Sequence, residues 1–172
     1  MRKVNMGFYT ILDDLYFYQM LSFVRKYSNY ELKLCKYFYN KTKGIIPECI
    51  VVIDKYIFFF VKKDSYFSSK IYLDSIRREI NPKKVLIIRY EKIFINLLFS
   101  FFPDLYIHDI RIENNETSGV REISVYFLTF KDRGIAIGRQ GEYIKSLNLL
   151  CKKYILLENK INPLEITCKT IN

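Results

Sequence analysis

The sequence predicts an α+β fold built from two similar halves, each with the order helix, strand, strand, helix, strand. Three observations lead to this prediction. Apolar residues recur at helical spacing in some segments and form short β-rich runs in others. The two kinds of segment follow one another in the same order twice. Short matching stretches also stand at corresponding places, since residues 58–64 (FFFVKKD) resemble residues 126–132 (YFLTFKD), and both Ile80 and Ile161 precede an Asn-Pro pair.

The first half begins with a helix expected over residues 29–42. Ser28 and Glu31 have the spacing of a capping box, in which the Ser hydroxyl and the Glu carboxylate each accept a backbone N–H at the start of a helix. Apolar residues follow at helical spacing, and Gly44 ends the pattern.

A hairpin, a short helix and a strand complete the first half. The β-rich runs Cys49–Ile53 and Tyr56–Val61 are separated by only two residues, which predicts a tight antiparallel hairpin. Apolar residues at helical spacing over residues 71–80 predict a short helix, which Pro82 ends because the residue before a proline disfavours helical geometry. Residues 85–90 predict the third strand.

The second half repeats this order. We expect a helix over residues 91–102, strands over residues 107–113 and 122–130, a helix over residues 141–154 and a last strand over residues 164–169. Residues 131–133 lead from the second of these strands into a short apolar turn, residues 135–137. The last strand again follows an Asn-Pro pair.

Residues 1–28 stand outside the repeat. The spacing of Ile11, Leu15, Tyr18 and residues 21–23 predicts one more amphipathic helix, which could pack on the first half or dock on a partner. The expected organisation is therefore an N-terminal helical extension (residues 1–28), a first domain (residues 29–90) and a second domain (residues 91–172).

Charge and hydropathy narrow the class of protein. Half of the 172 residues are apolar, which is enough for a buried core. The 28 Lys and Arg residues exceed the 18 Asp and Glu residues, giving a net charge of +10 that favours nucleic acid or another polyanion as a partner. The excess lies in the first half, because residues 1–90 carry 17 basic and 8 acidic residues, whereas residues 91–172 carry 11 and 10.

Membrane insertion, metal binding and catalysis find little support in the sequence. The longest apolar run, residues 93–102, is shorter than the ~20 residues that span a bilayer, and no signal peptide is visible, so we expect a cytoplasmic protein. The four cysteines are widely spaced and read as reduced, mostly buried thiols rather than zinc ligands. The single histidine, His108, has no neighbours in sequence that complete a catalytic site. We therefore expect neither an enzyme, nor a metal, nor a cofactor, nor a small-molecule substrate.

Glycine is concentrated at one place, since three of the six glycines are Gly134, Gly138 and Gly141. Gly138 and Gly141 form a Gly-x-x-Gly motif whose backbone a ligand can approach closely, because no Cβ atoms stand in the way. The free N–H groups at the start of the following helix favour a phosphate. Arg139 adds a positive charge, and Gln140 can donate or accept a hydrogen bond. The motif is also compatible with a plain helix–helix turn.

The surroundings of the motif favour an RNA-binding interpretation. Neither the dinucleotide-binding GxGxxG nor the P-loop GxxxxGK[ST] is present. The motif, the preceding apolar residues and the order of elements suit a KH module, whose GxxG loop clamps the backbone of about four nucleotides of single-stranded RNA. Gly138 and Gly141 would then lie against phosphates. The other candidate contacts are the apolar residues that support bases and two nearby cations: Ile135, Ala136, Ile137, Arg133 and Lys145.

The same residues carry a family resemblance. Residues 131–145 (KDRGIAIGRQGEYIK) and 149–154 (LLCKKY) resemble the second KH domain of the archaeal form of the NusA transcription factor. That family consists of two tandem type II KH domains. The first half resembles the family's first domain more loosely, over residues 31–34 (ELKL), 47–53 (PECIVVI) and 83–90 (KKVLIIRY).

The resemblance implies a transcription elongation or termination factor that binds nascent single-stranded RNA together with RNA polymerase. It implies RNA binding for the second domain only, because residues 66–73 (YFSSKIYL) replace the GxxG motif in the first. The alternative is a docking or structural subunit of a ribosome or polymerase assembly, since type II KH domains also occur in a protein of the small ribosomal subunit. The basic first half and the N-terminal extension favour that alternative, whereas the intact glycine motif favours direct RNA binding.

Overall fold

The computed structural model describes residues 12–171 and divides into two compact units. One unit is Phe23–Lys92, which we call the basic unit. The other combines residues 12–22 with residues 93–171, and we call it the glycine-turn unit. The part of the expected N-terminal extension that precedes residue 12 lies outside the described residues.

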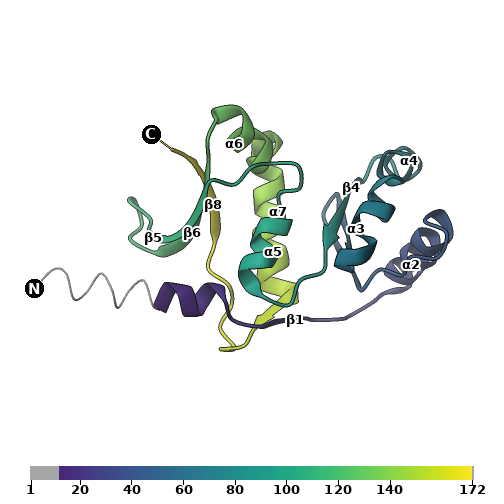
Figure 1. Cartoon of the computed structure of the whole chain (residues 1–172), viewed down its shortest axis with the longest axis horizontal. Coiled ribbons are helices and arrows are strands. Elements are labelled where there is room, and N and C mark those ends of the chain that lie inside the picture. The colour runs from purple at the N-terminus through teal and green to yellow at the C-terminus, as the bar shows by residue number, and fades with distance from the viewer. Residues whose placement is uncertain (1–11, 172) are drawn as a thin grey trace, which may run out of the picture. The chain divides into compact units, whose positions relative to one another are not determined.

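The basic unit is an α+β unit with a three-stranded sheet (Figure 1). In chain order its elements are α2 (Asn29–Lys41), β2 (Cys49–Ile53), β3 (Tyr56–Val61), α3 (Lys63–Lys70), α4 (Leu73–Glu79) and β4 (Lys84–Arg89). The sheet has the order β2-β3-β4, in which β2 is antiparallel to β3 and β4 is parallel to β3.

The glycine-turn unit repeats this arrangement. Its elements are α5 (Phe94–Ser100), β5 (Asp109–Asn114), β6 (Arg121–Phe127), α6 (Phe130–Ile137), the 3₁₀ turn η1 (Arg139–Gly141), α7 (Glu142–Tyr154) and β8 (Ile166–Thr170). The sheet has the order β5-β6-β8, with β5 antiparallel and β8 parallel to β6. A separate two-stranded sheet pairs β1 (Leu21–Phe23) with β7 (Ile155–Leu157).

Local signals in the sequence account for the first helix and the hairpin. The Ser28 hydroxyl accepts the Tyr30 N–H at 3.2 Å, and the Glu31 carboxylate accepts the Ser28 N–H at 3.0 Å, so the expected capping box is confirmed. The hairpin is also confirmed, with Ile53 paired with Tyr56 and a left-handed Asp54 (φ 50°) in the turn.

The core of the basic unit lies between the sheet and its helices. Phe38 of α2 stacks on Phe59 of β3 with ring centroids 4.4 Å apart, and Ile76 of α4 is fully buried in the same cluster. Burial of each such side chain contributes about 1.5–3 kcal/mol. Phe60 on the opposite face of β3 is buried as well, and its ring lies 4.8 Å from that of Phe23.

The core of the glycine-turn unit is formed by α5, α7 and one face of the sheet. Leu97, Phe127 and Leu147 have no exposed surface. Tyr143 of α7 is buried, and its hydroxyl donates to the carbonyl oxygen of Phe101 at the end of α5. This bond satisfies the one polar atom that the tyrosine brings into the core.

Residues 12–22 of the N-terminal extension belong to the glycine-turn unit, whereas residues 23–28 belong to the basic unit. Residues 12–17 are helical, and the Tyr16 ring lies 5.5 Å from that of Phe94. The Tyr16 hydroxyl accepts the Leu164 N–H at 2.8 Å, and burial raises the pKa of this tyrosine to about 12. The expectation of a helix through residues 21–23 is wrong, because these residues form β1. Ile11 lies outside the described residues.

Two expectations about the segment before the glycine motif are wrong. The strand expected to reach Phe130 ends at Phe127, because the Thr129 hydroxyl accepts the Asp132 N–H at 3.0 Å and starts α6. The residues expected as an apolar turn, 135–137, are the last three residues of that helix.

Two elements were not expected at all. One is α3, whose sequence KDSYFSSK places only Tyr66 and Ser69 in the core and so lacks a helical apolar stripe. The other is β7, which follows α7 without a break and depends on a partner strand more than 130 positions away in the sequence. Among residues 12–171, none of the helices is long and apolar enough to cross a bilayer.

Candidate nucleic-acid interface

The glycine motif forms a left-handed turn between α6 and α7. Gly138 ends α6 with φ 79°, and Gly141 immediately precedes α7 with φ 73°. Gln140 between them also has positive φ, at 55°. A Cβ at Gly138 would lie 2.7 Å from the Tyr143 Cβ, whereas one at Gly141 would make only ordinary contacts. Glycine is therefore required at position 138 by close packing, and is favoured at position 141 by its φ alone.

The turn directs backbone donors outward. The N–H of Gly138 donates to Gly134, that of Gly141 to Gly138, and that of Glu142 to Arg139. Within the described turn this leaves the N–H groups of Arg139 and Gln140 as the donors available to an anion. A residue in left-handed geometry after one in helical geometry makes successive N–H groups converge, as in many phosphate sites. The positive end of the 13-residue α7 lies at the same place.

A groove runs beside this turn. It has a volume of about 710 Å³ and lies between the end of α6, one face of α7 and residues 162–168, which lead into and form the first part of β8. Its apolar lining includes Ile137, Ile144 and Leu149. The volume falls in the range of ordinary ligand sites, roughly 300–1,000 Å³.

Three cations line the groove, whereas Glu165 is the acidic residue in its lining. The cations are Arg133 of α6 and Lys145 and Lys152 of α7. Lys145 points toward the glycine turn, since its Nζ lies 3.5 Å from the Gln140 carbonyl oxygen. The groove therefore favours a ligand that carries negative charge along an extended chain and apolar faces within it.

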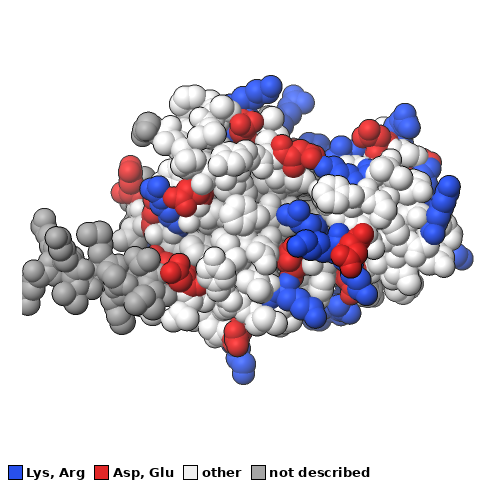
Figure 2. All heavy atoms as spheres, viewed as in Figure 1, with Lys and Arg blue, Asp and Glu red and all other residues white. Residues whose placement is uncertain are grey.

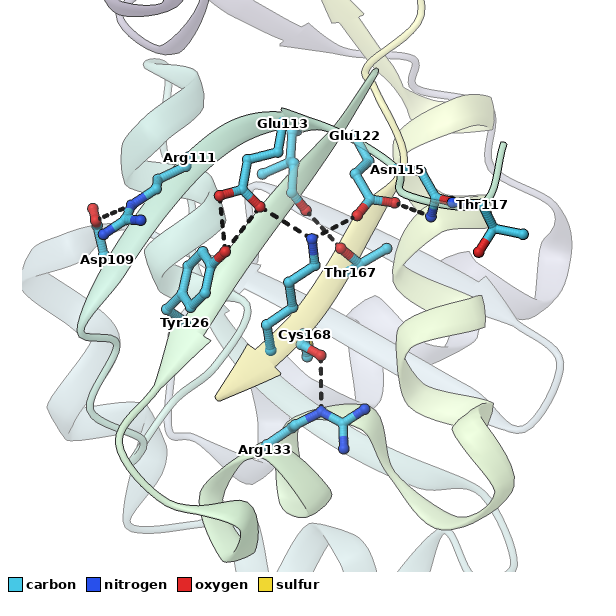
Figure 3. Close-up of polar contacts among 12 residues, drawn as sticks. Asp109, Arg111, Glu113, Asn115, Thr117, Glu122, Tyr126, Arg133, Thr167 and Cys168 are labelled. Carbon is cyan, nitrogen blue, oxygen red and sulfur yellow. Dashed lines mark hydrogen bonds and ion pairs between the residues drawn. The ribbon is translucent and has the colours of Figure 1, made fainter. Parts of the chain in front are cut away.

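One edge of β8 borders the groove. The side chains of Asn148 and Arg133 form hydrogen bonds with backbone groups along this edge. The Asn148 amide donates to the Ile166 carbonyl at 3.0 Å and accepts the Ile166 N–H at 2.7 Å. The Arg133 Nε donates to the Cys168 carbonyl at 2.9 Å (Figure 3). Residues 165 and 171 bond to β6 instead. Alternation along the strand therefore directs the backbone groups of Ile166 and Cys168 toward the groove.

The residues proposed from the sequence fall into three groups. Arg133, Ile137 and Lys145 line the groove. The turn itself holds Gly138, Arg139, Gln140 and Gly141, of which Arg139 and Gln140 are exposed. The remaining two do not line the groove, because Ala136 is buried in the core and Ile135 is 55 % exposed.

Apart from Lys145, sequence reasoning missed the wall of the groove that α7 forms. Lys145, Asn148, Leu149 and Lys152 stand at spacings of three, four and seven residues, which places them on one face of the helix. This spacing, with two cations and an amide beside the glycine motif, could have predicted that this face of α7 lines the site. Residues 162–168 carried no comparable signal, because their place in the groove depends on the parallel pairing of β8 with β6.

The outer face of the same sheet carries a polar network (Figure 3). The Lys169 ammonium of β8 lies 3.0 Å from a carboxylate oxygen of Glu113 and 3.0 Å from one of Glu122. The Tyr126 hydroxyl donates to Glu113, and the Asn115 amide donates to Glu122 at 2.9 Å. Burial opposes ionisation of Glu113 and Glu122, but these hydrogen bonds outweigh it and hold the pKa of each carboxyl below its ordinary value.

The corresponding turn of the basic unit is built differently. Ile71 and Tyr72 connect α3 to α4 with right-handed helical backbone, at φ −61° and −91°. No residue from Lys63 to Glu79 has positive φ. The backbone there therefore does not form a concave set of donors like that of the glycine turn.

The described residues contain no group of three or more His, Cys, Asp and Glu side chains that could hold a metal ion. The cysteines are unpaired, and Cys49, Cys151 and Cys168 are buried. Burial raises the pKa of the Cys151 thiol to about 12. His108 lies beside β5, and its backbone N–H donates to the Tyr126 carbonyl oxygen.

Comparison with known proteins bears on the fold alone. No protein-family model matches the chain, and no curated protein matches it. Among solved structures, the chain is similar to the crystal structure of APE1850, with 19 % sequence identity and a TM-score of 0.56. The similarity covers 83 % of this chain and 99 % of that one. At this identity it concerns the fold alone, and the chain is an α+β protein.

Proposed function

We propose that the chain is a tandem type II KH protein that binds single-stranded RNA in the groove of the glycine-turn unit. It acts on nascent RNA as a transcription elongation or termination factor together with RNA polymerase. The observation that carries the RNA-binding part is the left-handed glycine turn beside a cation-lined groove of about 710 Å³. Binding requires neither a metal nor a cofactor.

The order of elements supports the KH interpretation. Each unit contains the helix, strand, strand, helix, strand order that the sequence led us to expect, with one further short helix before the second helix. In each sheet the first two strands are antiparallel and the last is parallel to its neighbour. The glycine motif stands between the two helices of the second unit, where a KH module holds its RNA-clamping loop.

The groove suggests a role for each group of residues. The N–H groups of Arg139 and Gln140 donate to a phosphate at the turn, and the Arg139 side chain adds charge there. Bases lie over Ile137, Ile144 and Leu149, where apolar contact favours their faces without selecting a sequence. The cations of α7, Lys145 and Lys152, lie along the phosphate backbone of the RNA strand.

The transcription part of the proposal rests on the resemblance of residues 131–154 to the archaeal NusA type. The alternative is a docking subunit of a ribosome or polymerase assembly. This alternative fits the surface of the basic unit, because the turn between α3 and α4 lacks the open backbone of the glycine turn.

Gly141 offers the sharpest test of RNA binding. Its Cβ direction is open, with the nearest atoms 3.7 Å and 3.9 Å away, so a side chain can be accommodated there. We expect Gly141→Asp to weaken binding of single-stranded RNA by roughly tenfold or more, equivalent to ~1.4 kcal/mol, because it places a carboxylate beside the phosphate. The measurement is fluorescence anisotropy with a labelled, random-sequence single-stranded RNA.

Gly141→Asn is the matched control. Asn has nearly the same shape as Asp and tolerates left-handed backbone equally well, so it imposes the same strain without the charge. It should stay within about threefold of the unmodified protein. Equal affinities for the Asp and Asn variants would show that no phosphate lies at the turn. Gly138 is unsuitable for this test, because any side chain there collides with Tyr143.

A further inference from the structure

Two apolar side chains of the basic unit are among the most exposed in the described chain. Phe67 of α3 and Ile71 at its C-terminal end are each 76 % exposed. They stand four residues apart in helical backbone, so they lie next to each other on one face. We call this pair the α3 patch.

The α3 patch is not needed by the core of its own unit. The inward face of the same helix is formed by Tyr66 and Ser69, which are 6 % and 0 % exposed. Phe67 and Ile71 point away from the core into solvent, where contact of their apolar side chains with water is unfavourable. Adjacent exposed large apolar side chains on a helix commonly mark a surface that another molecule covers.

The α3 patch lies at a position in the basic unit that corresponds to the glycine motif of the other unit. In the glycine-turn unit, the end of the equivalent helix α6 carries the open backbone of Gly138 and Gly141. In the basic unit the end of α3 carries Ile71 instead, in right-handed geometry. A surface built of protruding apolar side chains suits recognition by packing into a partner's pocket, whereas phosphate recognition needs exposed N–H donors.

The charge of the basic unit indicates the chemistry of the partner. Residues 23–92 contain 16 Lys and Arg against 7 Asp and Glu, whereas the rest of the chain contains 12 and 11. In the sequence, exposed cations precede the patch at Lys62 and Lys63 and follow it at Arg77 and Arg78, and they outnumber the exposed carboxylates of the same segment, Asp64, Asp74 and Glu79. Figure 2 shows Lys and Arg at several places on the visible face of this unit.

We propose that the α3 patch is a docking surface for a protein segment that presents apolar residues flanked by Asp and Glu. Phe67 and Ile71 provide the apolar contact. The surrounding cations raise the association rate of an acidic segment and disfavour basic ones. This surface belongs to a different unit from the RNA groove.

The test is selection of displayed random peptides on the immobilised full-length chain, followed by affinity measurement of the enriched peptides as labelled synthetic peptides. We expect the enriched sequences to combine aromatic or aliphatic residues with several Asp or Glu. The double change Phe67→Ser with Ile71→Ser should weaken their binding by about tenfold or more, because it removes the buried anchors of the interface. Lys62→Glu with Lys63→Glu should also weaken peptide binding, in this case only because positive charge is replaced by negative charge.

A matched control comes from the other unit. Phe130 and Ile135 of α6 are 77 % and 55 % exposed, so Phe130→Ser with Ile135→Ser makes the same chemical change outside the patch. Its peptide affinity should equal that of the unmodified protein. All variants should keep their circular dichroism spectra, because the changed side chains are exposed.

Three results would overturn the proposal. The first is that no peptide is enriched whose binding depends on Phe67 and Ile71. The second is that the enriched peptides lack acidic residues. The third is that Phe67→Ser with Ile71→Ser weakens single-stranded RNA binding as strongly as Gly141→Asp, which would make the patch an RNA contact.

Discussion

Arg133 links the backbone of β8 to the ligand groove. Its Nε donates to the Cys168 carbonyl, and in Figure 3 its two terminal nitrogens point away from that bond. The side chain lines the groove and also the polar cleft on the outer face of the sheet. A guanidinium suits this position because it can hold a carbonyl oxygen with one N–H and still offer a fork of donors to a phosphate.

Arg133→Lys separates these two roles. Lysine keeps the charge, but its single ammonium cannot bond the Cys168 carbonyl and a phosphate in the same fixed geometry. We expect RNA affinity to fall by about tenfold, or ~1.4 kcal/mol, with little change in the midpoint of urea unfolding. Arg111→Lys is the control, since Arg111 pairs with Asp109 at 2.6 Å on the outer face and does not line the groove. An equal loss in both variants would contradict a specific role for Arg133.

At the scale of elements, the sequence predicted a helix or a turn correctly where the residues that determine it are close together in the chain. The capping box at Ser28 and the two-residue hairpin turn are decided by residues within four positions of one another, and both were predicted correctly. The helix α3 was missed because its stability depends on Tyr66 packing beneath β4, where the Arg89 guanidinium lies 5.4 Å from its ring centroid. In the candidate site, the glycine turn was found and the wall formed by residues 162–168 was not.

The sheet of the glycine-turn unit has one feature that no local signal could reveal. Lys169 of β8 joins Glu113 of β5 to Glu122 of β6, so a single ammonium connects all three strands on the outer face. The strands come from residues 109–170 and meet only in the folded sheet. Because Glu122 is only 5 % exposed, loss of its cation leaves a nearly buried charge unpaired.

Lys169→Met should therefore destabilise the protein in a pH-dependent way. Both carboxyls have lowered pKa values in the folded protein, so their stabilising contribution is present above the ordinary Glu pKa and is lost as pH falls through the folded pKa. We expect Lys169→Met to reduce the free energy of unfolding by about 1–2 kcal/mol at neutral pH. The difference should shrink at about pH 4, where the carboxyls take up protons.

Urea unfolding at the two pH values measures this effect. Lys131→Met is the control, because Lys131 is exposed on α6 and forms no ion pair with the described residues. A destabilisation by Lys169→Met that is the same at both pH values would indicate lost packing rather than lost charge pairing.

At the scale of the whole molecule, the excess of positive charge and the proposed phosphate site lie in different units. The basic unit has an excess of nine positive charges, from 16 basic and 7 acidic residues, whereas the glycine turn and its groove belong to the unit that is close to neutral. If the net charge served RNA binding, removal of cations from the basic unit would lower RNA affinity. If it serves an acidic protein partner, as the α3 patch suggests, RNA affinity should depend on the groove alone.

The dependence of RNA affinity on salt distinguishes the two cases. Four phosphate contacts, from Arg133, Arg139, Lys145 and Lys152, predict a slope of roughly −3 for log affinity against log salt, at about −0.7 per contact on a single strand. Lys145→Gln with Lys152→Gln should reduce the slope to about −1.4, because two of the four contacts are lost. Replacement of Lys62, Lys63, Lys83 and Lys84 by Gln should leave it unchanged, although it removes more charge. A flatter slope in that fourfold variant would instead place the RNA on the basic unit, since only cations that contact phosphates release counterions.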